Sequence, residues 1–441
     1  MKGLSLEAAA QHIVTISREL GAEETTARVS KGSWTELTRR DGKVEKAQES
    51  RSLSAGVSLM VDGRYSSHST SDLRPDALRS FLERAVAATR FLEPDENRRL
   101  PELAEMGSAD EDLDPLDAGQ ATRTPDDRRA AVEALETRAH AHTADLATRS
   151  ITAFGWDGAS ESALVTSHGF ASSWASTSFG LGASVSLEDE GGKLPEAWTS
   201  YQARHAEDVP DPEAIAADLA ERGRARLGSG PMESGRYALL LDRRVVSGLM
   251  RVLMGPLSGT AIFEGRSCLK DKLGEKIASE AFTLIDDPLI RRGLGSRPHD
   301  GDGLPARRRT IVENGMLKMF FLSIYNSRRL GVPGTTGSAS NLIIPAGSRS
   351  PTELAAEHGR VIRVDGFLGG NSNAATGDFS FGIQGALLED GVPVRALSEM
   401  NVSGDLFGLL ERFVDAANDP WTHGSWRTPT LLFKDVQFSG A

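Results

Sequence analysis

Hydrophobic and polar positions follow two different periods in the N-terminal part of the chain. From Leu4 to Leu20 the apolar residues recur every three or four positions, which predicts an amphipathic helix that ends at Gly21. A second helix is predicted over Pro75–Phe91, with proline at its first position, where the missing N–H is not needed. Asp41-Gly42 and Asp62-Gly63 are hairpin turn signals between these helices. The first part of the chain is therefore predicted to run helix, strands, helix.

Segments in which polar and apolar residues alternate predict the strands. Three such short segments lie between the two N-terminal helices, and a Ser/Thr/Gly-rich region further along the chain predicts several antiparallel strands. Helical spacing returns on both sides of that region. The predicted strands are Thr25–Ser30, Trp34–Arg39, Ser54–Val61 and several within Ser150–His205, and the flanking helices are Asp126–Thr148 and Pro212–Leu227.

Two segments of unusual composition suggest where the chain divides. Glu93–Thr124 is acidic and contains proline, which is typical of a solvated linker or an interdomain loop. Gly228–Gly235 combines glycine, proline and serine and is the best candidate for a domain boundary. From Arg236 onward, glycine, proline and short apolar runs indicate a β-rich region.

Helices and antiparallel strands that are segregated along the chain predict an α+β fold. We expect an N-terminal α+β domain over residues 1–228 and a β-rich C-terminal domain over residues 229–441. A further subdivision of the first domain near residues 93–124 is left open.

Charge and cysteine content restrict the classes of function. The chain has 50 basic and 62 acidic residues, a net charge of −12, which argues against a nucleic-acid-binding protein. No apolar stretch approaches the roughly 18 residues of a membrane-spanning helix. Cys268 is the single cysteine, so no intrachain disulfide can form, which fits a reducing cytoplasm. We therefore expect a cytoplasmic protein without nucleic-acid or membrane partners.

Local motifs for catalysis are missing. None of the nine histidines is followed by glutamate, and neither a GxSxG elbow nor a phosphate-binding loop occurs. A Ser/His/Asp triad stays open, because triads assemble in space rather than in sequence. Cys268 has no histidine nearby in sequence to activate it, so a small, partly buried structural side chain is the preferred interpretation.

Five long segments resemble one known family. They begin with GVSLMVDGRYSSHSTSDLRPDALRS, include TGDFSFGIQGALLEDGVPV and end with ANDPWTHGSWRTPTLLFKDVQFSG. In order along the chain, they are similar to the TldD/PmbA peptidase family, and within it to the PmbA branch, also called TldE. The segments are Gly56–Arg90, Ser258–Pro288, Arg291–Gly331, Thr376–Val394 and Ala417–Gly440.

The resemblance implies a cytoplasmic peptidase that works as a dimer. Typically a TldD-like subunit pairs with a TldE-like subunit, and only the TldD-like subunit carries zinc, held by an HExxxH helix and a cysteine near the C-terminus. Such pairs degrade unfolded peptides and mature ribosomal peptide products, for example by leader removal. An older description as modulators of DNA gyrase is treated as indirect, because an acidic chain has no evident means of holding DNA.

The present chain departs from the TldD pattern at every zinc ligand. The place of the zinc helix is Arg244–Val252, which contains neither histidine nor glutamate. The place of the cysteine ligand is Pro420–Thr428, where Trp421, His423 and Trp426 stand without a cysteine. His423 alone is no zinc site, and a surface-loop histidine is expected. The resemblance thus implies no cofactor in this chain and zinc in a TldD-like partner.

Two segments are candidate substrate contacts. Gly377 would allow a peptide backbone to approach closely, and a glycine-rich strand edge here would accept an extended peptide by strand addition. The alternative for this segment is a tight turn into a core strand. The second segment is the loop Gly295–Leu304, for which a turn with exposed acids is the alternative. The candidate residues are Thr376, Gly377, Asp378, Phe379 and Ser380 in the first segment, and His299 and Asp300 in the second.

The leading hypothesis is a non-zinc subunit of a heterodimeric metallopeptidase that cleaves unfolded or leader peptides. The alternative is a stand-alone homodimeric protein that binds peptides as a scaffold without catalysis. A third hypothesis, a metal-independent hydrolase that uses serine or Cys268, requires activity of the isolated chain in the presence of a chelator.

Overall fold

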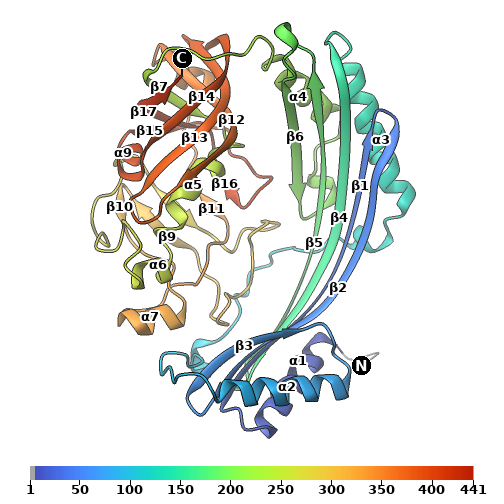
Figure 1. Cartoon of the computed structure of the whole chain (residues 1–441), viewed down its shortest axis with the longest axis vertical. Helices are drawn as coiled ribbons and strands as arrows, with labels where there is room; N and C mark the ends of the chain where they lie inside the picture. The colour runs from blue at the N-terminus through green and yellow to red at the C-terminus, as the bar shows by residue number, and fades with distance from the viewer. Residues whose placement is uncertain (1–4, 441) are drawn as a thin grey trace.

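A long, twisted antiparallel sheet forms one side of the molecule, and a barrel with an attached smaller sheet forms the other (Figure 1). The computed structural model describes residues 5–440. The fold is α+β, as the sequence predicts. We call residues 5–228 the sheet domain and residues 229–440 the barrel domain.

The sheet domain is built on six strands in the order β3-β2-β1-β4-β5-β6, and all neighbouring pairs are antiparallel. Their alternating side chains separate the two faces of the sheet. The strands are β1 (Glu24–Arg40), β2 (Lys43–Val61), β3 (Arg64–Thr70), β4 (Thr148–Thr166), β5 (Ala171–Leu187) and β6 (Glu196–Ala203).

The two short strands predicted at Thr25–Ser30 and Trp34–Arg39 are one continuous strand, β1. Gly32 between them does not break the ladder, because it lies opposite Ser52 of β2 and Ser160 of β4. Pairing on both sides therefore overrides the weak strand preference of glycine.

Four helices cover one face of this sheet in two pairs. Ala27 and Val29 belong to the core under α1 and α2, whereas Ile151 and Ala153 belong to the core under α3 and α4. The predicted start of the first helix, Leu4, lies outside the described residues. The helices are α1 (Leu6–Glu19), α2 (Pro75–Thr89), α3 (Pro125–His142) and α4 (Pro212–Arg224).

Helix α3 ends at His142, earlier than the predicted Thr148, because β4 already begins at Thr148. Helices α2, α3 and α4 each begin with proline. The starts of α2 and α4 are the predicted ones, Pro75 and Pro212, and α3 begins one residue before its predicted start.

The acidic segment between α2 and α3 is an interdomain loop rather than a solvated linker. The amides of Gly107 and Ala109 donate to the carbonyls of Gly303 and Pro298 in the barrel domain, at 3.0 and 2.8 Å. The carbonyl of Pro115 accepts from Thr177 of β5 at 2.9 Å. The segment thus ties the long sheet to the barrel domain. It contains two short helices, η1 (Leu103–Glu105) and η2 (Ala118–Thr122).

The barrel domain contains a six-stranded sheet in the order β14-β13-β12-β7-β17-β15, in which β14 also pairs with β17 and closes a barrel. A five-stranded sheet, β10-β9-β8-β11-β16, packs beside it. The larger set comprises β7 (Gly235–Leu241), β12 (Arg360–Ser372), β13 (Asp378–Glu389), β14 (Val392–Asp405), β15 (Phe413–Ala416) and β17 (Leu431–Ser439); the smaller set comprises β8 (Leu284–Asp286), β9 (Arg309–Glu313), β10 (Met316–Leu317), β11 (Leu342–Ile343) and β16 (Trp426–Arg427).

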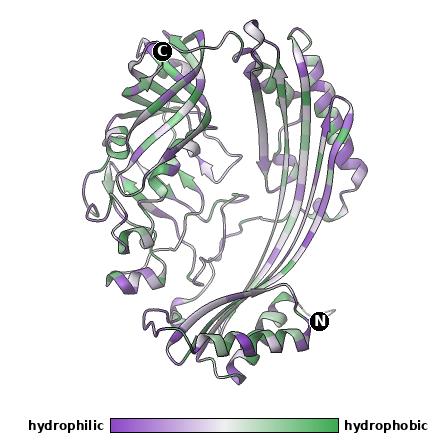
Figure 2. Ribbon diagram, in the orientation of Figure 1, coloured by the Kyte–Doolittle hydropathy of each residue, from purple (hydrophilic) through white to green (hydrophobic). Residues whose placement is uncertain are grey.

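Hydrophobic residues concentrate in the barrel domain, whereas the long strands carry a mixed pattern (Figure 2). No helix among residues 5–440 has the length and apolar character that crossing a membrane requires. The helices of the barrel domain are α5 (Val246–Met254), α6 (Gly259–Phe263), α7 (Ile324–Leu330), α8 (Pro351–Ala356) and α9 (Leu406–Glu411), and the sheet domain also has η3 (Glu190–Gly192) and η4 (Ala206–Asp208).

Candidate functional site

Helix α5 lies at the position where the family resemblance places a zinc-binding helix. Its sequence, VSGLMRVLM, contains no histidine, cysteine or carboxylate. Gly248 lets the Phe367 ring approach, since a Cβ there would lie 2.8 Å from a ring carbon. The helix is therefore a core element that offers no metal ligand. Its buried side chains are Val246, Leu249, Met250, Val252 and Leu253.

The segment expected to hold the cysteine ligand is a closed loop before β17. Asp419 accepts hydrogen bonds from the amide and the hydroxyl of Thr430, at 3.0 and 2.9 Å. Trp421 donates its amide to the Thr428 carbonyl at 3.0 Å, and β16 within the loop pairs with β11. These hydrogen bonds fix the backbone of the loop between Asp419 and Thr430, and with it the positions of the side chains that the loop carries.

His423 is half-buried against the edge strand of the long sheet, which corrects the expected surface-loop histidine. Its ring packs edge-on against Tyr201 and Trp421, with ring centroids 5.0 and 5.1 Å apart. Nδ1 lies 3.3 Å from the Gln202 carbonyl, which only accepts, so Nδ1 carries the hydrogen and Nε2 a lone pair. Burial lowers the pKa of His423 and favours the neutral ring.

An ion pair beside these rings joins the two domains. Arg244, just before α5, donates to Asp218 of α4 at 2.8 Å and to the Tyr201 hydroxyl at 3.1 Å. The other Asp218 oxygen accepts from the hydroxyls of Thr199 and Tyr201, at 2.5 and 3.1 Å. The guanidinium carbon of Arg244 lies 5.2 Å from the Trp421 ring centroid. Both charged groups are thus enclosed by partners from both domains.

Helix α4 and the residues just after it make further contacts with the barrel domain. Arg222 of α4 donates to the Asp365 carbonyl at 3.1 Å, and Arg226, two residues beyond the end of α4, pairs with the Asp365 carboxylate at 2.5 Å. Asp218 and Arg222 are four residues apart and share one helix face, so the C-terminal half of α4 and the residues after it are attached to the barrel domain.

A cavity of about 540 Å³ opens next to His423. One wall is the loop that joins β6 to α4, a second is the segment 291–294 and a third is the segment 422–427. The cavity therefore lies between the two domains, beside the position where the resemblance places the cysteine ligand.

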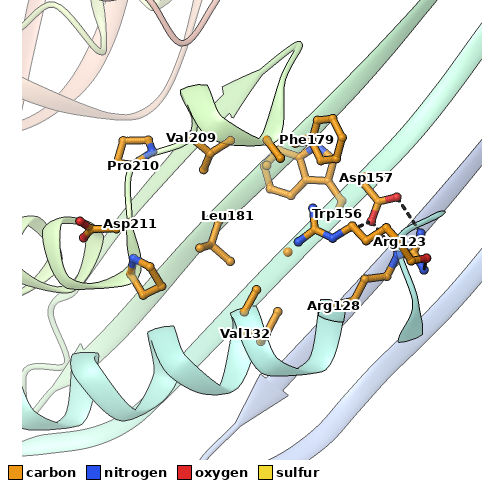
Figure 3. Close-up of a pocket in the computed structure, with 15 residues that line it drawn as sticks. Arg123, Arg128, Val132, Trp156, Asp157, Phe179, Leu181, Val209, Pro210 and Asp211 are labelled. Atoms are coloured by element: carbon orange, nitrogen blue, oxygen red, sulfur yellow. Dashed lines mark hydrogen bonds and ion pairs between the residues drawn. The ribbon is translucent and has the colours of Figure 1, made fainter. Parts of the chain in front are cut away.

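A second, smaller pocket of about 200 Å³ lies on the helix-covered face of the sheet, near the start of α3 (Figure 3). Arg128 donates to both oxygens of the buried Asp157 at 2.6 and 2.8 Å, and Gln120 donates at 3.1 Å. Asp157 is thus satisfied within the protein, and Asp211, the other carboxylate of this pocket, accepts from the Ala214 amide at 2.8 Å as the N-cap of α4.

The glycine-rich segment Thr376–Ser380 is not a strand edge, and this expectation is wrong. β13 pairs with β12 on one side and with β14 on the other, and Ser380 lies opposite Asn371 and Ser403. The backbone N–H and C=O groups on both sides of β13 are therefore already paired, so a peptide has no free strand edge to add to here.

The structure matches the alternative of a tight turn into a core strand. Gly377 has φ of +84°, donates to the Asn373 carbonyl and accepts from the Leu406 amide. Phe379 is buried in the barrel core, while Thr376, Asp378 and Ser380 are exposed. Substrate contact by these exposed side chains stays a prediction.

His299 and Asp300 are buried, so the expected alternative of a turn with exposed acids is wrong for this loop. His299 donates Nδ1–H to the Asp300 carbonyl at 2.8 Å and packs edge-on against Phe170, and burial lowers its pKa. Asp300 accepts from the amides of Asp302 and Leu304, both at 3.0 Å. The loop is braced internally, and substrate contact by His299 and Asp300 stays a prediction.

Zinc does not fit the residues at the expected position. Zinc needs several ligands from His, Cys, Asp or Glu around one point, and none of the described residues form such a group of three. Cys268 is half-buried beside Gly377, and burial raises the pKa of its thiol, with Asp378 and Asp405 adding to the effect. A raised pKa disfavours the nucleophilic thiolate.

The interdomain cluster itself was not predicted from the sequence. Tyr201 lies on β6, Asp218 on α4 and Arg244 in the loop before α5, and together they carry no motif. The one available signal was the run around Trp421 and His423, whose unusual side chains stand where the resemblance places a zinc ligand.

Comparison with known proteins covers nearly the whole chain. Models of the PmbA/TldA metallopeptidase match as domain 1 over residues 26–89, as the central domain over 115–227 and as the C-terminal domain over 234–440. Metalloprotease PmbA of Escherichia coli O157:H7 is 27% identical over 93% of this chain and 91% of its own.

Solved structures share the fold. A protein of Bacteroides thetaiotaomicron, described as a candidate modulator of DNA gyrase, is 33% identical, with a TM-score of 0.94 over 98% of both chains. TldE of Thermococcus kodakarensis is 21% identical, with a TM-score of 0.87 over 98% of this chain and 100% of its own. With three consecutive domain models matched and a relative of this similarity, the chain belongs to the PmbA/TldD metallopeptidase family.

Proposed function

We propose that this chain is the TldE-like, non-zinc subunit of a heterodimeric peptidase whose TldD-like partner carries the zinc. The proposed substrates are unfolded or leader-bearing peptides, and the proposed complex is cytoplasmic. One observation carries the proposal: the two positions expected to hold zinc ligands are filled by the apolar residues of α5 and by the aromatic loop around His423.

The chemistry of these residues supports a division of labour. In a metallopeptidase, zinc activates the attacking water. This chain offers neither a ligand set nor a glutamate base on α5. What it can contribute is a rigid wall, because Arg244–Asp218 and Arg226–Asp365 fix the two domains around a cavity. Holding a peptide in one pose removes much of the entropic cost of the reaction.

The alternative of a homodimeric, non-catalytic peptide-binding scaffold makes a different prediction about partners. It requires that the chain pairs with itself and does not copurify with a TldD-like protein. Tagged chain expressed together with a TldD-like protein from the same organism distinguishes the two, since a one-to-one complex is expected only for the heterodimer.

Metal analysis tests the non-zinc role directly. The purified chain, dialysed against zinc-free buffer, is expected to hold no stoichiometric zinc by mass spectrometry of the metal content. One tightly held zinc per chain would contradict the proposal. The one-to-one complex measured in the same way is expected to hold one zinc, contributed by the partner.

A further inference from the structure

Arg427 is a half-buried cation without an acidic partner. Among residues 5–440 no carboxylate lies within ion-pair distance of its guanidinium, which makes one hydrogen bond, to the Thr422 carbonyl at 3.2 Å. A guanidinium has five N–H donors, so most of its capacity is unused within the chain. Burial lowers the pKa of Arg427, and no neighbouring charge opposes that effect. Its positive charge is therefore uncompensated in a partly desolvated place.

Arg427 lines the 540 Å³ cavity beside His423, and the acids of that cavity are already engaged. Glu207 and Asp208 pair with Arg292 at 2.6 and 3.2 Å. Arg291, the other arginine of the wall, pairs with Asp114 at 2.9 Å. The unneutralised charge of the cavity therefore resides on Arg427.

Part of the cavity wall is apolar. Ala203, Val209, Pro210 and Leu294 supply aliphatic surface beside the charged groups. A ligand that satisfies both parts needs an anionic group for the guanidinium and an apolar group for this part of the wall. Carboxylate matches the planar donor fork of arginine, and such bonds gain strength where water is partly excluded.

We propose that this cavity binds a carboxylate attached to an apolar group, with Arg427 as the binding cation. The molecule that fits best is a peptide whose C-terminal residue has an aliphatic side chain, so that its terminal carboxylate binds Arg427. The choice of a peptide as the ligand, or carrier of the carboxylate, rests on the proposed function. A free aliphatic acid shares the same chemistry and is the other source. In this arrangement Arg427 fixes the end of the peptide, and Val209 and Leu294 contact its last side chain.

The test measures peptide binding by the full chain without any partner. An unstructured hexapeptide that ends in leucine, labelled at its N-terminus, is titrated as the free acid and as the C-terminal amide, with fluorescence anisotropy as the readout. The acid is expected to bind about tenfold tighter than the amide, the scale of one hydrogen bond to a charged group. Arg427→Gln should remove this difference, and Arg427→Lys should retain part of it because the charge is kept.

Arg51→Gln is the matched control, because the Arg51 side chain is 82% exposed and pairs with Glu49 on the same strand, away from the cavity. It should leave the preference for the acid unchanged. Equal affinities of the wild-type chain for acid and amide would overturn the proposal, whatever the variants do. A preference for the acid that persists in folded Arg427→Gln, checked by thermal melting, would overturn the role of Arg427.

The two carriers are distinguished by competition. N-acetyl-leucine is expected to displace the labelled peptide, because it has the same carboxylate and side chain. If N-acetyl-leucine binds, by calorimetry, and the peptide acid does not, the peptide as carrier is refuted and the free acid is assigned. Because the chain is tested alone, these results do not depend on whether the heterodimer or its zinc exists.

Discussion

The Arg244–Asp218 pair is predicted to couple the stability of the two domains. Replacing Arg244 with methionine keeps much of the side-chain volume and removes the charge. The variant loses the donations to Asp218 and to the Tyr201 hydroxyl, in a place where the Arg244 and Asp218 side chains are only 18% and 16% exposed.

The expected loss in the free energy of unfolding depends on the hydrogen bonds that Asp218 retains in the variant. A hydrogen bond to a charged group contributes about 1.5–3 kcal/mol. Asp218 still accepts from the hydroxyls of Thr199 and Tyr201 in the variant, so its charge is not left without partners. We therefore expect Arg244→Met to lower the free energy of unfolding by about 2–3 kcal/mol, below the cost of fully orphaning a buried charge.

A double-mutant cycle isolates the pair. Arg244→Met, Asp218→Asn and the double variant are unfolded in urea and followed by tryptophan fluorescence. The coupling energy is expected to be about 1–2 kcal/mol, the range for residues in one network. The control pair is Arg51 and Glu49, whose side chains are 82% and 59% exposed and for which about 0.5 kcal/mol or less is expected. A coupling energy for Arg244–Asp218 as small as the control value would refute the reasoning.

Three further predictions concern single residues. Gly377→Val should lower the free energy of unfolding by about 1–3 kcal/mol, because a β-branched residue is forced to positive φ and its Cβ would lie 3.3 Å from that of Leu406; an unchanged urea midpoint would contradict this. Cys268→Ala should cost at most about 1–2 kcal/mol and leave cleavage by the reconstituted pair intact, since its thiol has a raised pKa; loss of cleavage by a folded, assembled pair would show a catalytic role. Histidine NMR titration should place the pKa of His423 below its ordinary value of 6.5. The unfolded state then binds the proton more readily, so the contribution of His423 to stability is present above pH 6.5 and is lost as the pH falls toward the lower folded pKa. A pKa above 6.5 would contradict the burial of this ring.

Local signals in the sequence were sufficient for most elements of the sheet domain. Proline at the first position marks the starts of α2 and α4, and Asp41-Gly42 and Asp62-Gly63 form the turns they predict, each residue at positive φ. The sequence predicts two strands, one on either side of Gly32, and this prediction is wrong. Gly32 pairs with both β2 and β4, and this non-local pairing outweighs the low strand propensity of a single glycine.

The candidate site was less accessible to sequence reasoning because its geometry is non-local. Thr376–Ser380 reads as a glycine-rich strand edge until β14, more than 20 residues later, is seen to pair with it. Likewise, the lack of an acidic partner for Arg427 becomes evident only in the structure, where the nearby acids pair with Arg291 and Arg292. Resemblance to a family supplied the expected metal positions, and the sequence shows that zinc ligands are missing there, but the packing of α5 and of the loop around His423 is visible only in the structure.

Cleavage by the two subunits, apart and together, tests the central claim most directly. An unstructured peptide is incubated with this chain, with a TldD-like partner from the same organism, and with the mixture, after assembly is checked by size-exclusion chromatography. Only the mixture is expected to cleave the peptide, and a zinc chelator should abolish this cleavage, because the partner supplies the activated water and this chain holds the peptide. Full cleavage by the partner alone would remove this chain from the mechanism, and cleavage by this chain alone in the presence of the chelator would contradict its non-catalytic role.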